Sequence, residues 1–375
     1  MKSQIYPVLV GSDGRRGLTL DSAAFYVGAV LILVGLSVPQ LRHLSYIPAL
    51  FIPIALIASG GGRYIRGLLP FYFYFIGTFA ILPLANKQGV LDAFFLFAGL
   101  SLLLLKNIPD ISPRKLLLFV IFGYLIWLLI AKLDTGFRFS LTESTSFFES
   151  PFSFVFGACA VYFLAVGDKR YYIYSFVLTF LSFKRIAMLG LIAASLVYLA
   201  YRWRGIRLDR AWVLILLNML VLVALVAYGS GLLDYYIHAI TGQSSNQLGM
   251  GRRVLLQGVS NEILLNPMNF ILIGEGPGAL YSTVPVSNLY AGIKINAHSD
   301  LLKIFYEYGF VFFVGLIFMF YRGKWRREKL IYVYFNVLLF TDNTLIYTFV
   351  VFAVAYFARK LTYDGRGAAG GAVGL

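Results

Sequence analysis

The sequence predicts an all-α membrane protein with about twelve transmembrane helices. Hydrophobic residues make up 59% of the 375 residues and charged residues only 13%, whereas about a quarter of the residues of a soluble domain are charged. Apolar segments of helix length recur along the chain without the alternation of apolar and polar residues that a membrane β-strand shows. Only helices and closed barrels satisfy their own backbone in lipid, so the class is polytopic and helical.

The predicted spans follow one another with short connections, apart from one long polar gap before the last three. Several are shorter than the roughly 17–25 residues that usually cross a bilayer. We place them at residues 22–41, 46–61, 67–86, 89–105, 116–131, 152–167, 171–183, 186–201, 211–229, 301–321, 330–341 and 343–358.

Positive charge gives the orientation of these spans. Alternate threading places 22 of the 32 Lys and Arg residues on the side of both chain ends, and an excess of positive charge marks the cytoplasmic side. We therefore expect a cytoplasmic N-terminal segment, nine helices, one long outer loop that carries the chemistry, three more helices and a cytoplasmic Gly/Ala-rich tail. The N-terminal segment is residues 1–21, and the nine helices lie within residues 22–229. The outer loop is residues 230–300, the three further helices lie within residues 301–358, and the tail is residues 359–375.

The formal net charge of +15 is explained by this topology and by attraction to anionic lipid head groups, so it requires no nucleic-acid partner. The one cysteine, Cys159, lies inside a predicted span, which excludes a disulfide within the monomer. The three histidines have no spacing typical of a metal site, and we expect neither a metal ion nor another cofactor.

Two basic pairs stand on the outer side, where positive charge should be scarce. Lys184 and Arg185 separate two short apolar runs, and Arg252 and Arg253 begin the amphipathic segment 252–265. Each pair alone could be a snorkelling anchor or a head-group contact. Together they favour a site for a multiply charged anion such as a diphosphate, because guanidinium groups bind phosphate oxygens in pairs. Apolar residues at helical spacing predict a helix over 252–265, which Asn266-Pro267 ends.

His298 precedes the predicted span 301–321, and Asn296 or Ser299 is available as the N-cap of that helix. A neutral histidine at such a position can act as a general base, although it can equally be a polar residue that makes ordinary hydrogen bonds. Asp300 could orient His298, or it could serve as a first-turn charge that the helix dipole favours.

The run Gly274-Glu275-Gly276-Pro277-Gly278 resembles a dinucleotide-binding loop only superficially, because no strand precedes it. A turn packed on the membrane surface is the better interpretation. Glu275 could contact sugar hydroxyls or be a solvated turn carboxylate. Tyr281 could stack on a sugar or belong to the interfacial aromatic belt.

The order of these motifs resembles the O-antigen polymerase and ligase family (Wzy and WaaL type). The resemblance rests on Phe183-Lys184-Arg185, Gly251-Arg252, Asn266-Pro267, Gly274–Gly278, Ala297–Leu301 and Glu307-Tyr308-Gly309, and it covers about half of the chain. Phe148-Glu149-Ser150-Pro151 resembles an element of the polymerases. Leucines stand where a tryptophan often follows the Gly-Arg pair, and Ser299 stands where asparagine is usual, which leaves the choice between Arg252 and Arg253 open.

The resemblance implies a metal-independent, inverting glycosyltransferase of the GT-C type in the bacterial inner membrane. Its active site would face the periplasm, and its donor and acceptor would be glycans linked to undecaprenyl diphosphate. Arg185 and Arg252 would hold the donor diphosphate, and His298 would activate the acceptor hydroxyl. Lys184, Arg253, Glu275, Asp300 and Tyr281 are the further candidates for substrate binding.

The function that we expect is a polysaccharide polymerase, which moves a growing glycan onto the non-reducing end of a new repeat unit, with a chain-length regulator as a possible partner. One alternative is the ligase, which delivers the glycan to lipid A–core. The other is a secondary transporter or lipid flippase, in which the halves of the chain would repeat and charges would lie near the midplane.

Overall fold

The computed structural model describes residues 20–48, 89–90, 93–94, 111–132, 149–249, 251–283, 298–321, 327–342, 344–345 and 347–370. Every regular element among these residues is a helix, which confirms the all-α prediction. The predicted spans 46–61, 67–86 and 89–105 lie wholly or mostly outside the described residues, so the total of about twelve spans stays a prediction.

The helices follow the predicted spans closely. Among the described residues, four helices are long and apolar enough to cross a membrane, namely α5 (Pro113–Lys132), α8 (Arg185–Arg204), α9 (Ala211–Ser230) and α15 (Asp300–Tyr321). The other long elements are α1 (Leu20–Ser37), the 3-10 helix η1 (Pro39–Tyr46), α6 (Phe152–Val166), α7 (Lys169–Leu181), α16 (Glu328–Thr341) and α17 (Thr348–Gly370). α17 thus continues well into the predicted tail.

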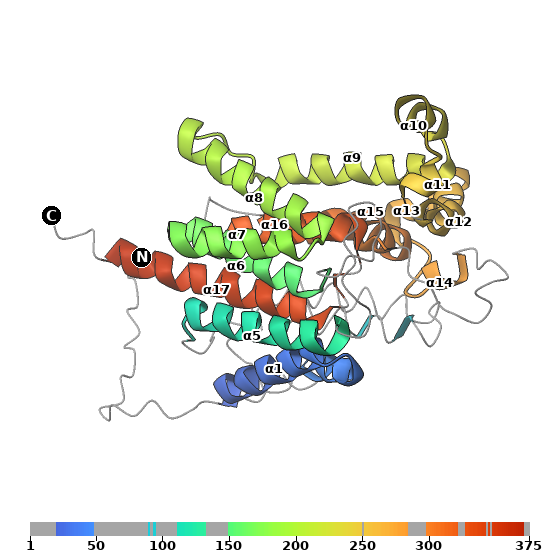
Figure 1. Ribbon diagram of the computed structural model, residues 1–375. Coiled ribbons are helices and arrows are strands. Elements are labelled where there is room, and N and C mark those ends of the chain that lie inside the picture. The colour runs from blue at the N-terminus through green and yellow to red at the C-terminus, as the bar shows by residue number, and fades with distance from the viewer. Residues whose placement is uncertain are drawn as a thin grey trace, which may run out of the picture.

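Long helices run side by side, and the short ones gather at one end of the bundle (Figure 1). We call this end the site end. It carries α10 (Asp234–Thr241), α11 (Ser245–Leu248), α12 (Arg252–Leu265), α13 (Asn269–Leu272) and α14 (Leu280–Thr283). The turn between α8 and α9 and the C-terminal part of α17 lie at the opposite end, which we call the far end.

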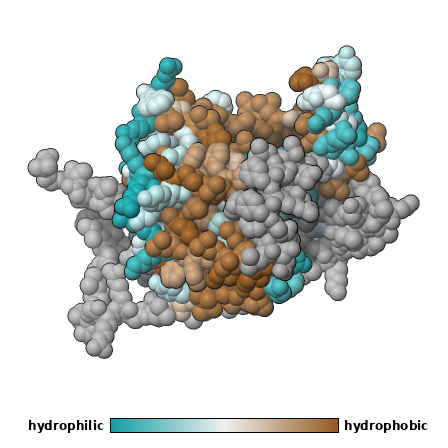
Figure 2. All heavy atoms as spheres, in the orientation of Figure 1, coloured by the Kyte–Doolittle hydropathy of each residue, from teal (hydrophilic) through white to brown (hydrophobic). Residues whose placement is uncertain are grey.

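An apolar band covers the middle of the visible surface, with polar residues gathered at the far end and around α10–α12 (Figure 2). The band contains large side chains that are more than half exposed, among them Phe122 of α5 and Leu220 and Val223 of α9. Soluble proteins rarely expose apolar patches of this extent, whereas lipid chains cover them at no cost. The surface therefore supports a multi-pass membrane protein.

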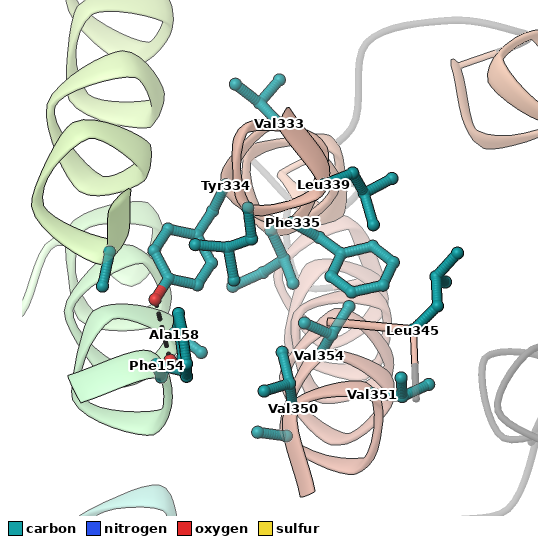
Figure 3. Close-up of a cluster of buried hydrophobic side chains, with 14 of the residues drawn as sticks. Phe154, Ala158, Val333, Tyr334, Phe335, Leu339, Leu345, Val350, Val351 and Val354 are labelled. Carbon is teal, nitrogen blue, oxygen red and sulfur yellow. Dashed lines mark hydrogen bonds between the residues drawn. The ribbon is translucent and has the colours of Figure 1, made fainter. Parts of the chain in front are cut away.

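In the core of the bundle, Tyr334 and Phe335 pack among aliphatic side chains of neighbouring helices (Figure 3). Tyr334 of α16 is fully buried between α6 and α8, and its hydroxyl donates to the Phe154 carbonyl at 2.9 Å. A Cβ atom at Gly157 would lie 2.3 Å from the Tyr334 hydroxyl oxygen, and one at Gly190 would lie 2.9 Å from the ring. Small residues let membrane helices approach closely, so these two glycines place α6, α8 and α16 around one tyrosine.

α15 is broken at Gly309, whose φ of 81° and ψ of 174° are open only to glycine. The break frees carbonyl groups that a continuous helix would use, and a free carbonyl within a membrane protein needs a partner. The loop after α13 supplies the partners. Glu275 N donates to the Tyr306 carbonyl at 2.9 Å, and Gly276 N donates to the Glu307 carbonyl at 3.0 Å.

Glycine at two positions permits this close approach. A Cβ atom at Gly274 would lie 2.6 Å from the Tyr306 carbonyl oxygen, and one at Gly309 would lie 2.9 Å from the Ile273 nitrogen. The Glu307 carboxylate completes the joint, because it accepts hydrogen bonds from Gly278 N at 3.0 Å and from Leu280 N at 3.4 Å. The Gly274–Gly278 run is therefore a backbone partner for a broken helix.

Gly309→Ala should lower the free energy of unfolding by about 2 kcal/mol or more, because alanine is strained at this φ and ψ and its Cβ would meet the α13 backbone. Gly315→Ala in the same helix is the matched control, since a Cβ atom there has nothing within 4 Å. The control should be neutral or up to about 1 kcal/mol more stable. Denaturant titration in mixed micelles measures the free energy of unfolding of both variants. If the two substitutions change it equally, the break in α15 does not require glycine at residue 309.

A buried ion cluster joins the helices at the far end. The Asp209 carboxylate accepts hydrogen bonds from Arg207 Nε at 2.6 Å and from Lys329 Nζ at 3.1 Å, and Lys329 also donates to the Tyr321 carbonyl at 2.8 Å. Asp209 is fully buried and Lys329 nearly so. Burial alone raises the pKa of the Asp209 carboxyl, but the hydrogen bonds from Arg207 and Lys329 outweigh it and hold the pKa below its ordinary value.

Asp209→Asn should cost about 3–5 kcal/mol, because two cations lose their counter-ion and one of them is buried. Asp168→Asn should cost about 0–1 kcal/mol, because its partner Arg114 is 60% exposed and asparagine still caps α7. Since the folded pKa of Asp209 is lowered, its stabilisation is present above the ordinary value of 3.8 and is lost as pH falls through the lowered value. Unfolding titrations of both variants over pH check this.

Candidate functional site

The polar residues singled out in the sequence lie where helices begin or end at the site end. Lys184 precedes α8, Arg252 begins α12, and His298 lies two residues before α15. The C-terminus of α16 and the residues before α6 reach the same place, as the contacts below show. Five chain segments that are distant in sequence thus contribute to one site.

The first pair of basic residues lies on a tight turn between α7 and α8. Lys184 Nζ contacts the Glu149 carboxylate at 3.0 Å, and Ser150 N donates to the Ser182 carbonyl at 3.3 Å. The Glu149-Ser150 element and the Lys184-Arg185 element therefore dock on each other. Arg185 is the first residue of α8, and its side chain is exposed. Lys184 and Arg185 thus lie where α7 ends and α8 begins.

Among the described residues, the non-glycine residues with positive φ are Phe183, at 50°, and His298, at 51°. This left-handed conformation costs an ordinary side chain about 1–2 kcal/mol. Such outliers concentrate at functional sites, where surrounding contacts hold them. Phe183 lies directly before Lys184-Arg185, and His298 is the candidate base itself. Strained backbone therefore occurs at the basic pair and at the base.

The structure separates the roles of Arg252 and Arg253, which the sequence left open. Arg253 forms a two-point ion pair with Asp234, at 3.0 Å from Nε and 2.6 Å from Nη2. Arg252 instead reaches across the bundle, where its Nη1 donates to the carbonyl of Thr341 at 3.2 Å. A carbonyl contact does not neutralise Arg252, and no carboxylate of the described residues forms an ion pair with it, whereas Asp234 neutralises the charge of Arg253.

His298 is half-buried, and its electrostatic surroundings are set by three charged residues. Burial lowers the pKa of its imidazole below 6.5, the charges of Arg252 and Lys184 lower it further, and the charge of Asp342 acts in the opposite direction. Arg252, Lys184 and His298, which the sequence predicts to share one site, are therefore also neighbours in the structure. The lowered pKa keeps the imidazole neutral at neutral pH, the state in which it can accept a proton.

Ser299 and Asp300 hold the start of α15. Ser299 Oγ accepts from Leu302 N at 3.2 Å, which makes Ser299 the N-cap. The Asp300 carboxylate is buried and accepts from Leu345 N at 2.7 Å and from Thr344 Oγ1 at 3.3 Å. It therefore ties α15 to the segment between α16 and α17, and the expectation that Asp300 orients His298 or binds substrate does not fit this geometry.

The sequence analysis missed two acidic residues of the site. Asp342 is buried after α16, where its carbonyl accepts from Asp300 N at 3.2 Å and its carboxylate accepts from the Tyr347 hydroxyl at 3.2 Å. Glu149 was noted only as part of a motif. No local pattern marks Asp342, whereas the Glu-Ser-Pro sequence before a span was a signal that could have identified Glu149.

Glu275 and Tyr281 belong to a second polar group on the loop that docks at the break of α15. Glu275 accepts from Asn269 Nδ2 at 3.4 Å, and Lys303 Nζ lies 5.0 Å from the centre of the Tyr281 ring. In the same group the Tyr306 hydroxyl is hydrogen-bonded to the Glu262 carboxylate and lies 2.8 Å from Thr283 Oγ1. These contacts fix α14 to α12 and α15, so the substrate-binding roles of Glu275 and Tyr281 stay predictions.

The described part of the chain contains no group of three or more His, Cys, Asp or Glu side chains that could hold a metal ion. The side chains described at the site supply a chemistry of their own. It combines the exposed guanidinium of Arg185, the charge of Arg252, the Lys184–Glu149 pair and a neutral imidazole. Such a set can bind a multiply charged anion and accept a proton beside it.

Replacing Arg252 should raise the pKa of His298, whereas replacing Arg253 should leave it unchanged. The charge of Arg252 acts directly on His298, and Asp234 already neutralises Arg253. With His43 and His238 changed to asparagine, His298 is the one histidine left, and NMR of isotope-labelled histidine follows its titration. The parent should titrate below 6.5, Arg252→Gln should titrate higher, and Arg253→Gln should match the parent. An equal shift in both variants would contradict this arrangement.

Comparison with known protein families finds a match to the region that contains these residues. A family model described as O-antigen ligase matches residues 171–317, which run from α7 through most of α15 and include every predicted site residue. No curated protein and no solved structure matches the chain. Residues 171–317 of this multi-pass protein are thus similar to the O-antigen ligase family.

Proposed function

We propose that the protein is a polysaccharide polymerase of the bacterial inner membrane, which transfers a glycan from undecaprenyl diphosphate to a repeat unit carried by a second undecaprenyl diphosphate at the periplasmic face. The observation that carries the proposal is the neutral His298 beside the charges of Arg252 and Lys184. A base next to fixed cations is what a transfer from a diphosphate to a hydroxyl requires. The family match supports glycan transfer and does not separate polymerase from ligase.

The cations act on the leaving group. Negative charge grows on the diphosphate as its bond to the anomeric carbon breaks, so fixed positive charges stabilise the transition state more than the ground state. Arg252 and the exposed Arg185 provide these charges. Lys184 contributes less charge, because the Glu149 carboxylate compensates it, and its contact with Glu149 fixes the turn that precedes Arg185. With these residues the leaving group requires no metal ion.

His298 acts on the acceptor. The oxygen of the acceptor hydroxyl forms a bond to the anomeric carbon, the bond from that carbon to the diphosphate oxygen breaks, and the hydroxyl proton passes to the neutral imidazole. Displacement from the opposite side inverts the anomeric centre. A positioned base of this kind contributes about 10²–10⁴-fold to the rate. The neighbouring Asp342 stabilises the imidazolium that forms, since its charge raises the pKa of His298.

The ligase is the second candidate, because the matching family model is described as O-antigen ligase. It uses the same donor and the same base but takes lipid A–core as the acceptor. The sequence Phe148-Glu149-Ser150-Pro151, which resembles an element of the polymerases, supports the first candidate. The two functions differ only in the acceptor, so one assay with two acceptors separates them.

The test uses purified protein with a synthetic diphosphate-linked repeat unit, alone or with lipid A–core, and resolves the products on a gel. A ladder from the repeat unit alone supports the polymerase, and one transferred glycan on lipid A–core supports the ligase. His298→Asn should lower the rate by about 10²-fold or more. Asparagine is suited to this variant because it tolerates the left-handed backbone that residue 298 adopts.

Arg252→Gln should abolish the product, whereas Arg253→Gln, its neighbour in the sequence, should keep most of the activity, because Arg253 is occupied by Asp234. Each variant is first shown to insert and to purify as the parent does. Parental activity in His298→Asn and Arg252→Gln, both correctly folded, would overturn the proposed roles. Uptake of a labelled substrate into proteoliposomes that these variants leave unchanged would favour a transporter.

A further inference from the structure

The outer loop contains a segment that is unusually apolar for a loop in water. Residues 263–274 include no charged side chain, and their polar side chains are two asparagines. Six large apolar residues of this segment are exposed, between 44% and 79%, namely Leu264, Leu265, Met268, Ile271, Leu272 and Ile273. Soluble surfaces rarely group so many exposed apolar side chains, so something other than water covers them.

The apolar surface continues onto a membrane span. The backbone of Leu272 and Ile273 lies directly against Gly309 of α15, as a Cβ atom built there shows. The residues that follow Gly309 in α15 are Phe310 and Val311, which are 37% and 58% exposed. Both belong to the part of α15 that is apolar enough to cross a membrane. The exposed residues of the loop and those of α15 after Gly309 thus lie next to each other, as the neighbouring positions of α13 and α15 also show (Figure 1).

The backbone of this segment is suited to a place at the edge of the bilayer. Irregular backbone is tolerated there only where its polar groups find partners in the protein. The chain that follows α13 meets this condition, because it pairs with the carbonyl groups of Tyr306 and Glu307 at the break. Phe270 anchors the segment from the other side, since it is fully buried and its ring stacks on that of Tyr306 at 5.2 Å.

The two charged side chains that flank the segment in the sequence, Glu262 and Glu275, are both hydrogen-bonded within the protein. The Glu262 carboxylate is bound to the Tyr306 hydroxyl, and Glu275 is bound to Asn269. The exposed Asn266 and Asn269 suit the boundary between head groups and acyl chains better than the centre of the bilayer. We propose that residues 264–273 insert into the leaflet on the site side and that the acyl chains of membrane lipids cover their six exposed apolar side chains.

This surface gives the loop a fixed depth in the membrane. α12 carries Arg252 at its start and leads into the inserted segment at its end. The same segment is joined to α15, which begins two residues after His298. The insertion therefore holds Arg252 and His298 at a fixed depth relative to the bilayer. It does not depend on the transfer chemistry, and its test requires no substrate.

A spin label at a single cysteine measures what covers the segment. Leu272→Cys is labelled in the full chain and reconstituted into lipid vesicles. The native Cys159 is fully buried and stays unlabelled. Collision with oxygen, which concentrates in lipid, is compared with collision with a water-soluble nickel chelate. Val223→Cys on the exposed side of α9 is the lipid control, and Gln243→Cys in the turn before α11 is the water control.

A label at residue 272 that behaves like the one at residue 223, with high oxygen and low nickel collision, supports insertion. Behaviour like that at residue 243 would show that the surface faces water. Low collision with both reagents would show that protein, either a second copy or another chain, covers it, and each of these two results overturns the proposal. Met268→Cys and Leu265→Cys repeat the measurement at other exposed positions, so a failure of one variant to fold leaves the test intact.

Discussion

The hydrogen-bond requirement of a broken membrane helix organises the site end. Once α15 adopts the Gly309 conformation, the carbonyl groups of Tyr306 and Glu307 lose their partners within the helix and must find others. The loop at Glu275 and Gly276 satisfies them, and Glu307 in turn holds the start of α14. The length and glycine content of the outer loop follow from this joint, which fixes α13 and α14 against the helix that His298 precedes.

The second organising feature is the unequal use of positive charge. Some cations have an acidic partner that fixes their position, as Asp234 does for Arg253 and Asp209 does for Lys329. Arg252 instead contacts a carbonyl, and its field extends to His298. The protein thus stabilises some cations by ion pairs, whereas Arg252 is held by a carbonyl and its charge is available to an anion. This difference, rather than the number of basic residues, distinguishes the site from the rest of a basic chain.

Hydropathy alone predicted the helices well, because lipid permits few alternatives to a helix. The helix over 252–265 was predicted at both ends, since Gly251 precedes it and Asn266-Pro267 follows it. Arg252, Lys184 and His298 were predicted to share one site, and in the structure the charges of Arg252 and Lys184 act on His298. The part played by Asp342 and the pairing of Arg253 depend on contacts between segments distant in sequence, which no local pattern encodes. The contacts of Asp300 with the segment after α16 were not predicted, because a first-turn acid looks the same whether it faces a site or a neighbouring loop.

The ion cluster at the far end limits how the bundle can move. Asp209 belongs to the turn between α8 and α9, and its partner Lys329 is anchored to both α15 and α16. A rocking motion of one helix pair against the other, as in alternating access, would separate a buried carboxylate from a buried ammonium group and cost several kcal/mol. The ion cluster therefore resists movement of the helices at the far end. Any movement that admits or releases large substrates is expected in the loops and short helices of the site end.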